Sequence, residues 1–476
     1  MNQKLKQLLL ASIAVATSSC SAQVTEQSLT LHSNNQHVAF YLTNADQSSL
    51  FQQQLIALEP AKQNDLPTIN VSAQTSYQEI DGFGYTLTGG SAALISAMSS
   101  KAQDNLLNEL FGTGPNDIGV SYLRVSIGAS DLDSKVFSYN ELPVNETDIL
   151  LKKFSIDEDR KNLIPVLKKI LAINPAIKIM ASPWSAPIWM KTNQASKGGS
   201  LKAEYYGVYA QYFVKYIQSM QQEGIPIDAI TIQNEPLHPG NNPSLYMTAA
   251  AQAKFVKHNL GPAFKVANIT SKIVIYDHNA DRPDYPISIL DDAQAKQYID
   301  GSAFHLYGGK IENLSLVHEQ HPDKNIYFTE QWIGAPGDFA KDIKFHIKEL
   351  IIGATRNWSK IVLEWNLAAN SASQPHTDGG CDRCLGAVTI DGDQIKRNPA
   401  YYIITHAAKF VRPGSTRIDS NSSSDLPNVA FKTPTDDIVV IVLNNSENKK
   451  KFSIAVADKF IVTSLDVGAV GTFVWQ

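Results

Sequence analysis

The sequence predicts an α/β fold, a (β/α)8 TIM barrel with a small β-sandwich side domain built from both chain ends. The central part of the chain alternates eight apolar, strand-like runs with amphipathic helical stretches. Both ends lack helical periodicity and carry short β-like runs separated by turn residues. Hydrophobic residues make up 43% of the 476 residues, which is enough chain to bury a large core.

Residues 1–22 have the pattern of a secretory signal peptide. Lys4 and Lys6 precede an apolar run that is too short to cross a bilayer. Cleavage before Cys20 would leave a cysteine for lipidation, whereas cleavage after Ala22 would free the protein, and both alternatives stay open. We therefore expect an exported protein that is secreted, periplasmic or lipid-anchored at the cell envelope. Membrane contact is expected only through an N-terminal lipid anchor at Cys20.

Residues 24–75 and 410–476 are expected to form the β side domain. Short apolar runs bounded by turn residues predict strands at 38–42 and 68–72, and at 428–432, 438–443, 451–456 and 472–475. Because the two ends share this pattern and flank the barrel region, the simplest arrangement is that they meet in one domain.

Residues 76–409 are expected to form the catalytic barrel. The predicted strands are 82–87, 121–127, 177–181, 229–233, 272–276, 301–305, 325–329 and 360–364. The clearest helix is 201–223, where aromatic residues recur at helical spacing before Gly224, and we interpret them as core packing. A doubly wound open sheet is the alternative. It is disfavoured because the glycines after the first strand lack G-x-G-x-x-G spacing.

The predicted strand ends carry chemically active residues. Catalytic groups of such barrels lie at the C-terminal ends of the strands, and Glu235 and Glu330 close the fourth and seventh strands. Two carboxylates that face one substrate suit glycosidic bond hydrolysis, with a separation of roughly 5–5.5 Å in retaining enzymes. Asn234 is a candidate for binding a sugar hydroxyl. Trp184, Trp332 and Trp365 are candidates for stacking on sugar faces.

Composition and motif spacing disfavour other functions. The net charge of −5 provides no basic field for nucleic acid. His278 and His305 are interpreted as hydrogen-bonded structural residues. His346 and Glu349 lack the H-E-x-x-H order of zinc proteases. We therefore expect no metal and no cofactor, and the sequence assigns no oligomeric state.

Cys381 and Cys384 form a C-x-x-C in a glycine-rich loop. Because no second C-x-x-C exists and the chain is expected to be exported, a local disulfide is favoured over half of a zinc site.

The strand-end residues, taken in order, resemble glycoside hydrolase family 30, which contains glucosylceramidases and β-1,6-glucanases. The specific stretches are the ASPWSAPIWMK of residues 181–191 and the Asn-Glu-Pro of 234–236. The other matching segments are residues 81–84, 122–126, 304–307, 329–330, 364–368 and, in the side domain, 471–475.

The resemblance implies a retaining double displacement, with Glu235 as acid/base and Glu330 as nucleophile. Arg124 would support the nucleophile. The sugar subsite beside the scissile bond would be lined by Asp131, Trp184, Asn234, His305, Tyr307 and Trp365. Glu364 departs from the glucosylceramidase pattern, so a third catalytic carboxylate and a salt bridge to Arg124 both stay open.

The loop at 379–386 is similar to the microbial glucanase branch, so we expect a β-1,6-glucan substrate. A glucosylceramidase-type β-glucosidase that acts on glycolipid is the alternative, and a non-catalytic carbohydrate-binding protein is a minor one. For catalysis we expect the pKa of the acid Glu235 to be raised while Glu330 stays ionised, which gives a bell-shaped pH–rate profile.

Overall fold

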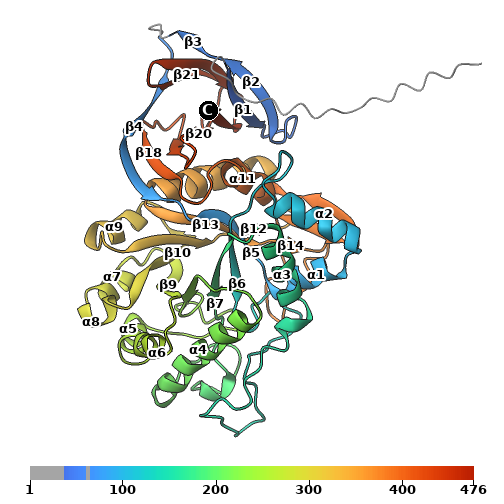
Figure 1. Ribbon diagram of the computed structural model, residues 1–476, viewed down its shortest axis with the longest axis vertical. Helices are drawn as coiled ribbons and strands as arrows, with labels where there is room; N and C mark the ends of the chain where they lie inside the picture. Colours follow the sequence, from blue (N-terminus) through green and yellow to red (C-terminus); the bar gives the residue numbers. More distant parts are fainter. Residues whose placement is uncertain (1–36, 61–64, 476) are drawn as a thin grey trace, which may run out of the picture.

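The computed structural model describes residues 37–60 and 65–475 (Figure 1). The predicted signal peptide, with Cys20, and residues 24–36 of the predicted side domain lie outside this part of the chain. Within the described ranges, no helix combines the length and apolar character needed to cross a membrane.

Eight parallel strands close into a barrel, which confirms the predicted fold class. The sequential order around the barrel is that of a (β/α)8 fold, and all eight predicted strands are present. They are β5 (Gly82–Thr86), β6 (Tyr122–Ser126), β7 (Lys178–Ser182), β8 (Ala229–Thr231), β9 (Lys272–Ala280), β10 (Ile299–Gly309), β11 (Asn325–Glu330) and β13 (Ser359–Asn366). A cluster of fully buried side chains fills the interior: Tyr122, Met180, Ala229, Val274, Ala303, Tyr327, Ile361 and Leu363.

Helices surround this barrel (Figure 1). They are α1 (Gly89–Ala97), α2 (Ser100–Phe111), α3 (Leu163–Ile173), α4 (Tyr206–Gln222), α5 (Ala249–Phe255), α6 (Gly261–Val266), α7 (Asp284–Leu290), α8 (Ala293–Lys296), α9 (Asn313–Gln320), α10 (Phe339–His346) and α11 (Pro399–Ala408). Helix α4 begins later than the predicted residue 201, because Leu201 forms a β-bridge with Lys191 and residues 203–205 make a 3-10 turn. Its aromatic stripe is buried, as the core-packing interpretation requires.

Both chain ends meet in one curved ten-stranded sheet. Its order is β2-β1-β23-β20-β19-β18-β4-β21-β22-β3. The strands are β1 (His37–Thr43), β2 (Gln52–Ala57), β3 (Glu59–Pro60), β4 (Thr68–Glu79), β18 (Thr416–Ser420), β19 (Asn428–Lys432), β20 (Ile438–Leu443), β21 (Lys450–Val456), β22 (Lys459–Leu465) and β23 (Val470–Trp475). All six predicted strands are present, whereas β2, β3, β18 and β22 were not predicted from the sequence.

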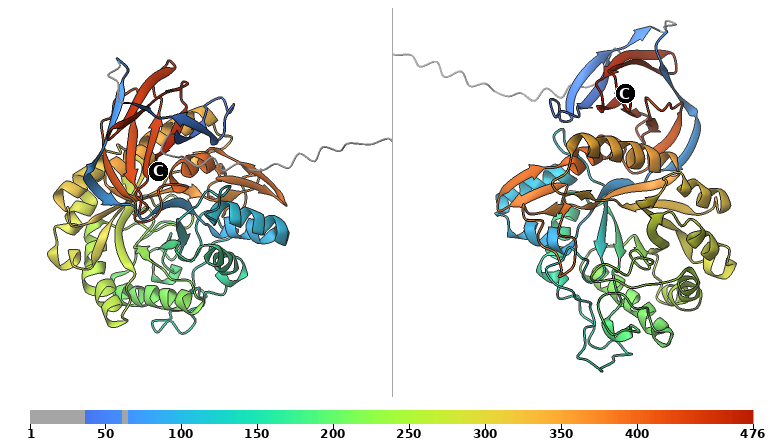
Figure 2. Two further views of the ribbon diagram at one scale, coloured as in Figure 1. Left: turned by 45° about the horizontal axis from the view of Figure 1, so that its top comes forward. Right: turned by 180° about the vertical axis from the view of Figure 1, so that it is seen from behind.

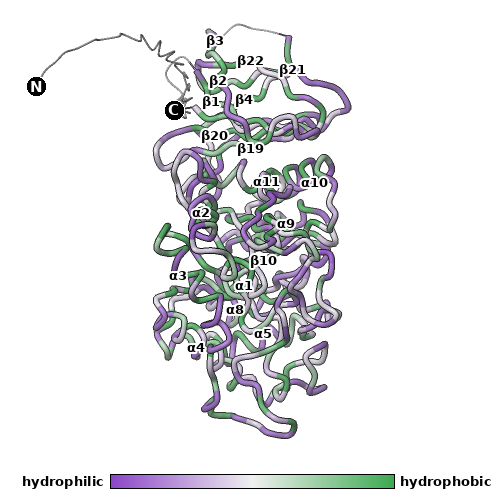
Figure 3. The backbone as a smooth tube through the Cα atoms, turned by 90° about the vertical axis from the view of Figure 1, so that its right-hand side faces the viewer, coloured by the Kyte–Doolittle hydropathy of each residue, from purple (hydrophilic) through white to green (hydrophobic). Residues whose placement is uncertain are grey.

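The side domain and the barrel share a packed boundary at helix α11, which lies between the two lobes (Figures 1 and 2). Alternate residues of β20 face two cores: Val440 belongs to the sandwich core and Ile441 to the core continuous with the barrel. Buried His406 on α11 makes hydrogen bonds of 2.8 Å to the hydroxyls of Thr43 and Thr472. The side view in Figure 3 shows the two lobes stacked along the long axis.

Two small sheets complete the described structure. The first pairs β12 (Ile333–Gly334) with β15 (Cys384–Leu385), and the second orders β14 (Ala368–Ala369), β16 (Val388–Asp391) and β17 (Gln394–Arg397). Because β12 and β14 directly follow barrel strands β11 and β13, these sheets hold loops at the C-terminal face of the barrel.

Candidate active site

A cavity of about 430 Å³ opens at the C-terminal ends of the barrel strands. Its lining includes six of the predicted site residues: Asp131, Trp184, Glu235, Tyr307, Glu330 and Trp365. The remaining predicted polar residues, Arg124, Asn234 and His305, are buried and bonded to the glutamates or to one another. The cavity therefore lies where the sequence places the candidate residues, at the strand ends.

Arg124 lies fully buried on β6 and joins three strand ends. One guanidinium nitrogen, Nη1, contacts Glu330 Oε2 at 2.5 Å. The other, Nη2, donates to Asp277 Oδ2 at 2.8 Å and to Asn234 Oδ1 at 2.7 Å. A planar guanidinium fixes the directions of its donors, so this arrangement orients the Glu330 carboxylate.

Asp277, on β9, is the main site residue that the sequence argument did not single out. Its buried carboxylate accepts hydrogen bonds from Arg124 and His305 and from three hydroxyls, those of Ser182, Thr231 and Thr329. Burial opposes its ionisation, but Arg124 and His305 outweigh that effect and lower the pKa of Asp277 below its usual range. Its place at a strand end was the available signal.

His305 lies between the two candidate catalytic glutamates. Its Nδ1 is 3.2 Å from Glu235 Oε1 and 3.6 Å from Glu330 Oε1, and its Nε2 is 3.1 Å from Asp277 Oδ1. Since both glutamate oxygens lie within 3.6 Å of one nitrogen, they are at most about 6.8 Å apart, which is near enough for both carboxylates to act on one substrate.

Tyr307 completes the environment of Glu330. Its hydroxyl donates to Glu330 Oε1 at 3.0 Å, while Arg124 holds the other oxygen. The Glu330 carboxylate is therefore fixed at both oxygens and is only 7% exposed to the cavity.

The backbone is strained where two of these side chains leave their strands. Glu235, Tyr276 and Asp277 have φ angles of 46°, 73° and 64°, in the left-handed region that non-glycine residues rarely adopt. The Glu235 amide donates to the Asp277 carbonyl at 2.9 Å, which holds the two strand ends together. Such strain persists only where surrounding contacts maintain it, and it is found mostly at functional sites.

In the free site, the surroundings shift the pKa values of the two glutamates in directions opposite to those expected for catalysis. Burial would raise the pKa of Glu235, but the adjacent His278 and His305 lower it below its usual range. Burial raises the pKa of Glu330, and the charges of Glu235 and Asp277 add to this effect. These directions were not predicted from the sequence, where both histidines are interpreted as structural residues.

His305 is the basic group among these carboxylates. Burial alone would lower the pKa of this imidazole, but the three surrounding carboxylates raise it to about 10. Protonated His305 then donates to Glu235 through Nδ1 and to Asp277 through Nε2. Nearby Asp131 is also perturbed, since burial and the charge of Glu330 raise its pKa to about 7.

Two tryptophans form one side of the cavity. The rings of Trp184 and Trp365 have centroids 5.4 Å apart, and the Arg124 guanidinium lies 4.8 Å from the Trp184 centroid. Trp184 is only 1% exposed, which leaves little of its ring free for stacking on a ligand. Trp332 is partly exposed and is the better candidate for stacking on a sugar face.

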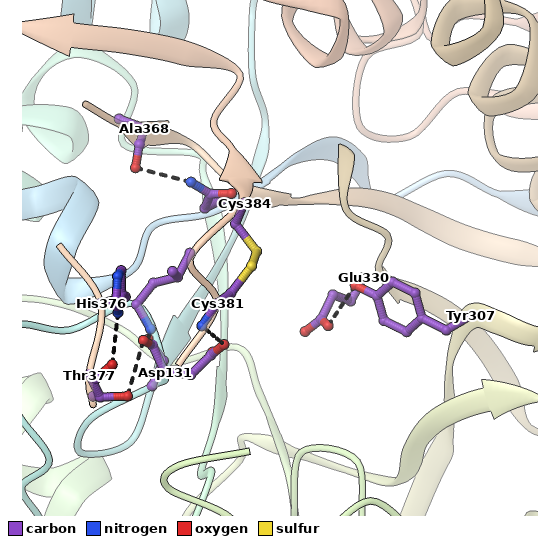
Figure 4. The surroundings of a disulfide bond; sticks show 11 residues. Asp131, Tyr307, Glu330, Ala368, His376, Thr377, Cys381 and Cys384 are labelled. Atoms are coloured by element: carbon purple, nitrogen blue, oxygen red, sulfur yellow. Dashed lines mark hydrogen bonds between the residues drawn. A yellow bond between two sulfur atoms is a disulfide. The ribbon is translucent and has the colours of Figure 1, made fainter. Parts of the chain in front are cut away.

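The predicted Cys381–Cys384 disulfide is present and lines the cavity. Its loop holds the backbone and side chain of Asp131: the Thr377 amide donates to the Asp131 carbonyl at 2.9 Å, and the Cys381 amide donates to Asp131 Oδ2 at 3.3 Å. Figure 4 shows this loop across from Glu330 and Tyr307.

Glu364 faces away from the cavity. Trp365 next to it lines the cavity, and successive strand residues point to opposite faces, so Glu364 points outward. There its Oε1 lies 2.7 Å from His346 Nδ1 on α10. Both earlier interpretations, a third catalytic carboxylate and a salt bridge to Arg124, are therefore wrong.

Comparisons with known proteins agree with this architecture. Residues 80–411 match the glycosyl hydrolase family 30 TIM-barrel domain, and residues 414–473 match the family 30 beta sandwich domain. An endo-1,6-beta-D-glucanase of Neurospora crassa is 32% identical over 400 residues, which cover 79% of this chain and 81% of that protein. The lysosomal acid glucosylceramidase of Mus musculus is 28% identical over 438 residues, with 86% and 83% covered.

The fold is also similar to that of a solved structure. The endo-beta1,6-glucanase BT3312 superimposes with a TM-score of 0.86 at 35% identity, covering 92% of this chain and 99% of that one. The family model spans more than half of the chain, and its two domains coincide with the barrel and the sandwich. The protein is therefore a glycoside hydrolase and belongs to glycosyl hydrolase family 30.

Proposed function

We propose that the protein is an exported retaining glycoside hydrolase that cleaves β-1,6-glucan. The observation that carries the proposal is the convergence of Glu235 and Glu330 on one cavity, with both carboxylates in contact with His305. For the substrate, the support is the identity of 32% and 35% to two endo-1,6-glucanases, against 28% to the glucosylceramidase.

In the first step, a Glu330 oxygen attacks the anomeric carbon of the bound glucosyl unit. The bond between that carbon and the glycosidic oxygen breaks, and the oxygen takes a proton from Glu235. Because the free site holds this proton on His305, hydrogen-bonded to Glu235 Oε1, the two residues act together as the proton donor.

In the second step, the Glu235 carboxylate takes a proton from water, and the water oxygen attacks the anomeric carbon. The ester bond to Glu330 breaks, and the sugar leaves with its original β configuration. Arg124 and Tyr307 stabilise the Glu330 carboxylate as it leaves, since both donate to its oxygens.

Export is the second part of the proposal. The predicted leader at 1–22 supports it, and the Cys381–Cys384 disulfide fits an oxidising compartment. The intact mass of the mature protein distinguishes a chain that begins at residue 23 from a lipidated chain that begins at Cys20. A mature protein that retains residues 1–19 would contradict this part.

The test of the activity is product release from linear β-1,6-glucan, followed by chromatography of the early products, with Glu330→Gln as the inactive control. A ladder of short oligosaccharides supports the proposal and endo action, and glucose alone supports exo action. If the protein releases nothing from this glucan but cleaves glucosylceramide in detergent, the proposed substrate is wrong and the glycolipid alternative holds. Binding without turnover on every β-glucoside would indicate the carbohydrate-binding alternative.

A further inference from the structure

Three side chains at the cavity point metal-ligand atoms at one spot. Glu235, His278 and His305 are all buried, and one ligand atom from each lies within 4.8 Å of the other two. Glu235 Oε1 is 3.2 Å from His305 Nδ1 and 3.8 Å from His278 Nδ1. The proposed hydrolytic steps give no role to His278.

His278 Nδ1 is a buried ring nitrogen without a hydrogen-bond partner. The whole residue is 7% exposed, and its ring lies beside Glu235 at the wall of the cavity. Buried polar atoms are almost always paired, so an unpaired nitrogen aimed at a carboxylate requires an explanation. A cation placed between the nitrogen and the carboxylate oxygen would satisfy both atoms.

The neighbours of His305 orient it as a ligand. Its Nε2 contacts Asp277 Oδ1 at 3.1 Å, which leaves Nδ1 directed at Glu235. Metal-binding histidines usually donate their other ring nitrogen to a carboxylate in this way. Asp277 is itself held by Arg124 and by three hydroxyls, so the imidazole is fixed before any ion arrives.

The spacing fits a tetrahedral ion. Zinc bonds to nitrogen and oxygen of about 2.0–2.2 Å place tetrahedral ligand atoms about 3.4 Å apart. Two of the three separations, 3.2 and 3.8 Å, lie on either side of that value. The third, between the ring nitrogens of His278 and His305, is at most 4.8 Å, so the two imidazoles would move together around the ion. The fourth position would face the cavity, where water can occupy it.

We propose that Glu235, His278 and His305 form a binding site for a divalent transition-metal ion such as Zn²⁺, and that the bound ion inhibits hydrolysis. Two imidazoles and one carboxylate favour Zn²⁺, Co²⁺ and Cu²⁺ over Mg²⁺ and Ca²⁺, which prefer all-oxygen sites. The ion takes the place of the proton between His305 and Glu235. Inhibition rests on the proposed role of Glu235, whereas metal binding does not.

Binding is tested on the full-length mature protein with the metal alone. Co²⁺ is titrated while the visible absorption that tetrahedral Co²⁺ produces is recorded, and Zn²⁺ binding is measured by calorimetry. We expect one site, displaced by Zn²⁺ and unaffected by millimolar Mg²⁺ or Ca²⁺. If the unmodified protein gives no tetrahedral Co²⁺ spectrum and no Zn²⁺ binding at millimolar metal, the site does not exist.

His278→Ala and His238→Ala are the matched variants. His238 is an exposed histidine at the rim of the same cavity, outside the three-residue group. Because loss of an outer-shell partner already weakens metal binding by about 10- to 100-fold, loss of His278 as a direct ligand should weaken Zn²⁺ binding at least 100-fold. His238→Ala should leave it unchanged. Equal effects of the two substitutions would overturn the assignment.

Activity is measured separately on an aryl β-glucoside, with each variant compared with its own metal-free rate. We expect Zn²⁺ to inhibit the unmodified protein at the concentration that fills the Co²⁺ site, and a chelator to restore the rate. If the metal fills the site without slowing turnover, the inhibition is refuted and so is the role of Glu235 as acid/base. The metal site itself would stand.

Discussion

Asp277→Asn is the substitution that tests the electrostatic arrangement beneath the cavity. The change keeps the size and shape of the side chain but removes the charge that faces Arg124 at 2.8 Å. It also replaces one acceptor oxygen with an amide that donates. Because the five side chains that bond to the Asp277 carboxylate all donate to it, at least one buried donor would then face another donor.

The expected cost follows from burial. Both side chains of the Arg124–Asp277 pair are 0% exposed, so solvent cannot compensate for the lost charge. Breaking a buried ion pair by removing one partner typically costs about 3–5 kcal/mol of unfolding free energy. The matched control is Asp284→Asn, which removes a pair to Arg282 whose side chains are 65% and 51% exposed. Exposed pairs contribute less than about 1 kcal/mol.

Urea unfolding followed by tryptophan fluorescence measures the difference. Trp184 and Trp365 lie 4.8 and 6.0 Å from the Arg124 guanidinium, so their emission reports on the barrel around the substitution. We expect the Asp277→Asn midpoint to fall well below that of Asp284→Asn, which stays near the unmodified protein. Equal midpoints for the two variants would refute the reasoning that Asp277 supports the buried network.

Three further predictions concern the site. Tyr307→Phe removes a hydrogen bond to the charged Glu330, which is worth about 1.5–3 kcal/mol. On an aryl β-glucoside, kcat/KM should therefore fall about 10- to 150-fold with little change in Tm. An unchanged kcat/KM would contradict a role of this hydrogen bond in the reaction. In the pH profile of kcat/KM, the midpoint of the acid limb should lie above pH 4.5, because burial raises the pKa of Glu330 above this ordinary value and the nucleophile must be ionised. On the basic side, activity should persist well above pH 6.5, because His305 keeps its proton up to about 10; a basic limb below pH 6.5 would contradict this. Replacing both Cys381 and Cys384 with Ser should raise KM about 2- to 12-fold with kcat nearly unchanged, since the loop contact to Asp131, which we propose binds substrate, is worth about 0.5–1.5 kcal/mol. An unchanged KM would show that the loop keeps its position without the disulfide.

The sequence predicted the barrel because its signals are local. Each barrel strand is an apolar run with a helical stretch behind it, and the catalytic candidates occupy the same position at each strand end. The missed strand β2 (Gln52–Ala57) has a polar first half, and β18 (Thr416–Ser420) alternates charged and apolar residues over a short length. Such strands form because neighbouring strands pair with them, which a pattern within one segment does not report.

The sequence predicts where the site lies, but it does not predict how the charged side chains interact there. Glu235 and Glu330 follow from their strand-end places, whereas the role of Asp277 depends on donors from five other strands. The pKa order of the glutamates depends on distances to His278 and His305 across the barrel. These contacts are long-range, so residue identity alone does not determine them.

The most direct test of the double-displacement account is to trap the covalent intermediate with a 2-deoxy-2-fluoro-β-glucosyl fluoride and to map the label by mass spectrometry. Trypsin releases residues 325–341 as one peptide, in which Glu330 is the single glutamate and Asp338 the other carboxylate. The account predicts one fluoroglucosyl group on this peptide, with fragmentation placing it on Glu330. A label on Asp338 or on any other peptide, or no label on a protein that turns over the parent glucoside, would contradict it.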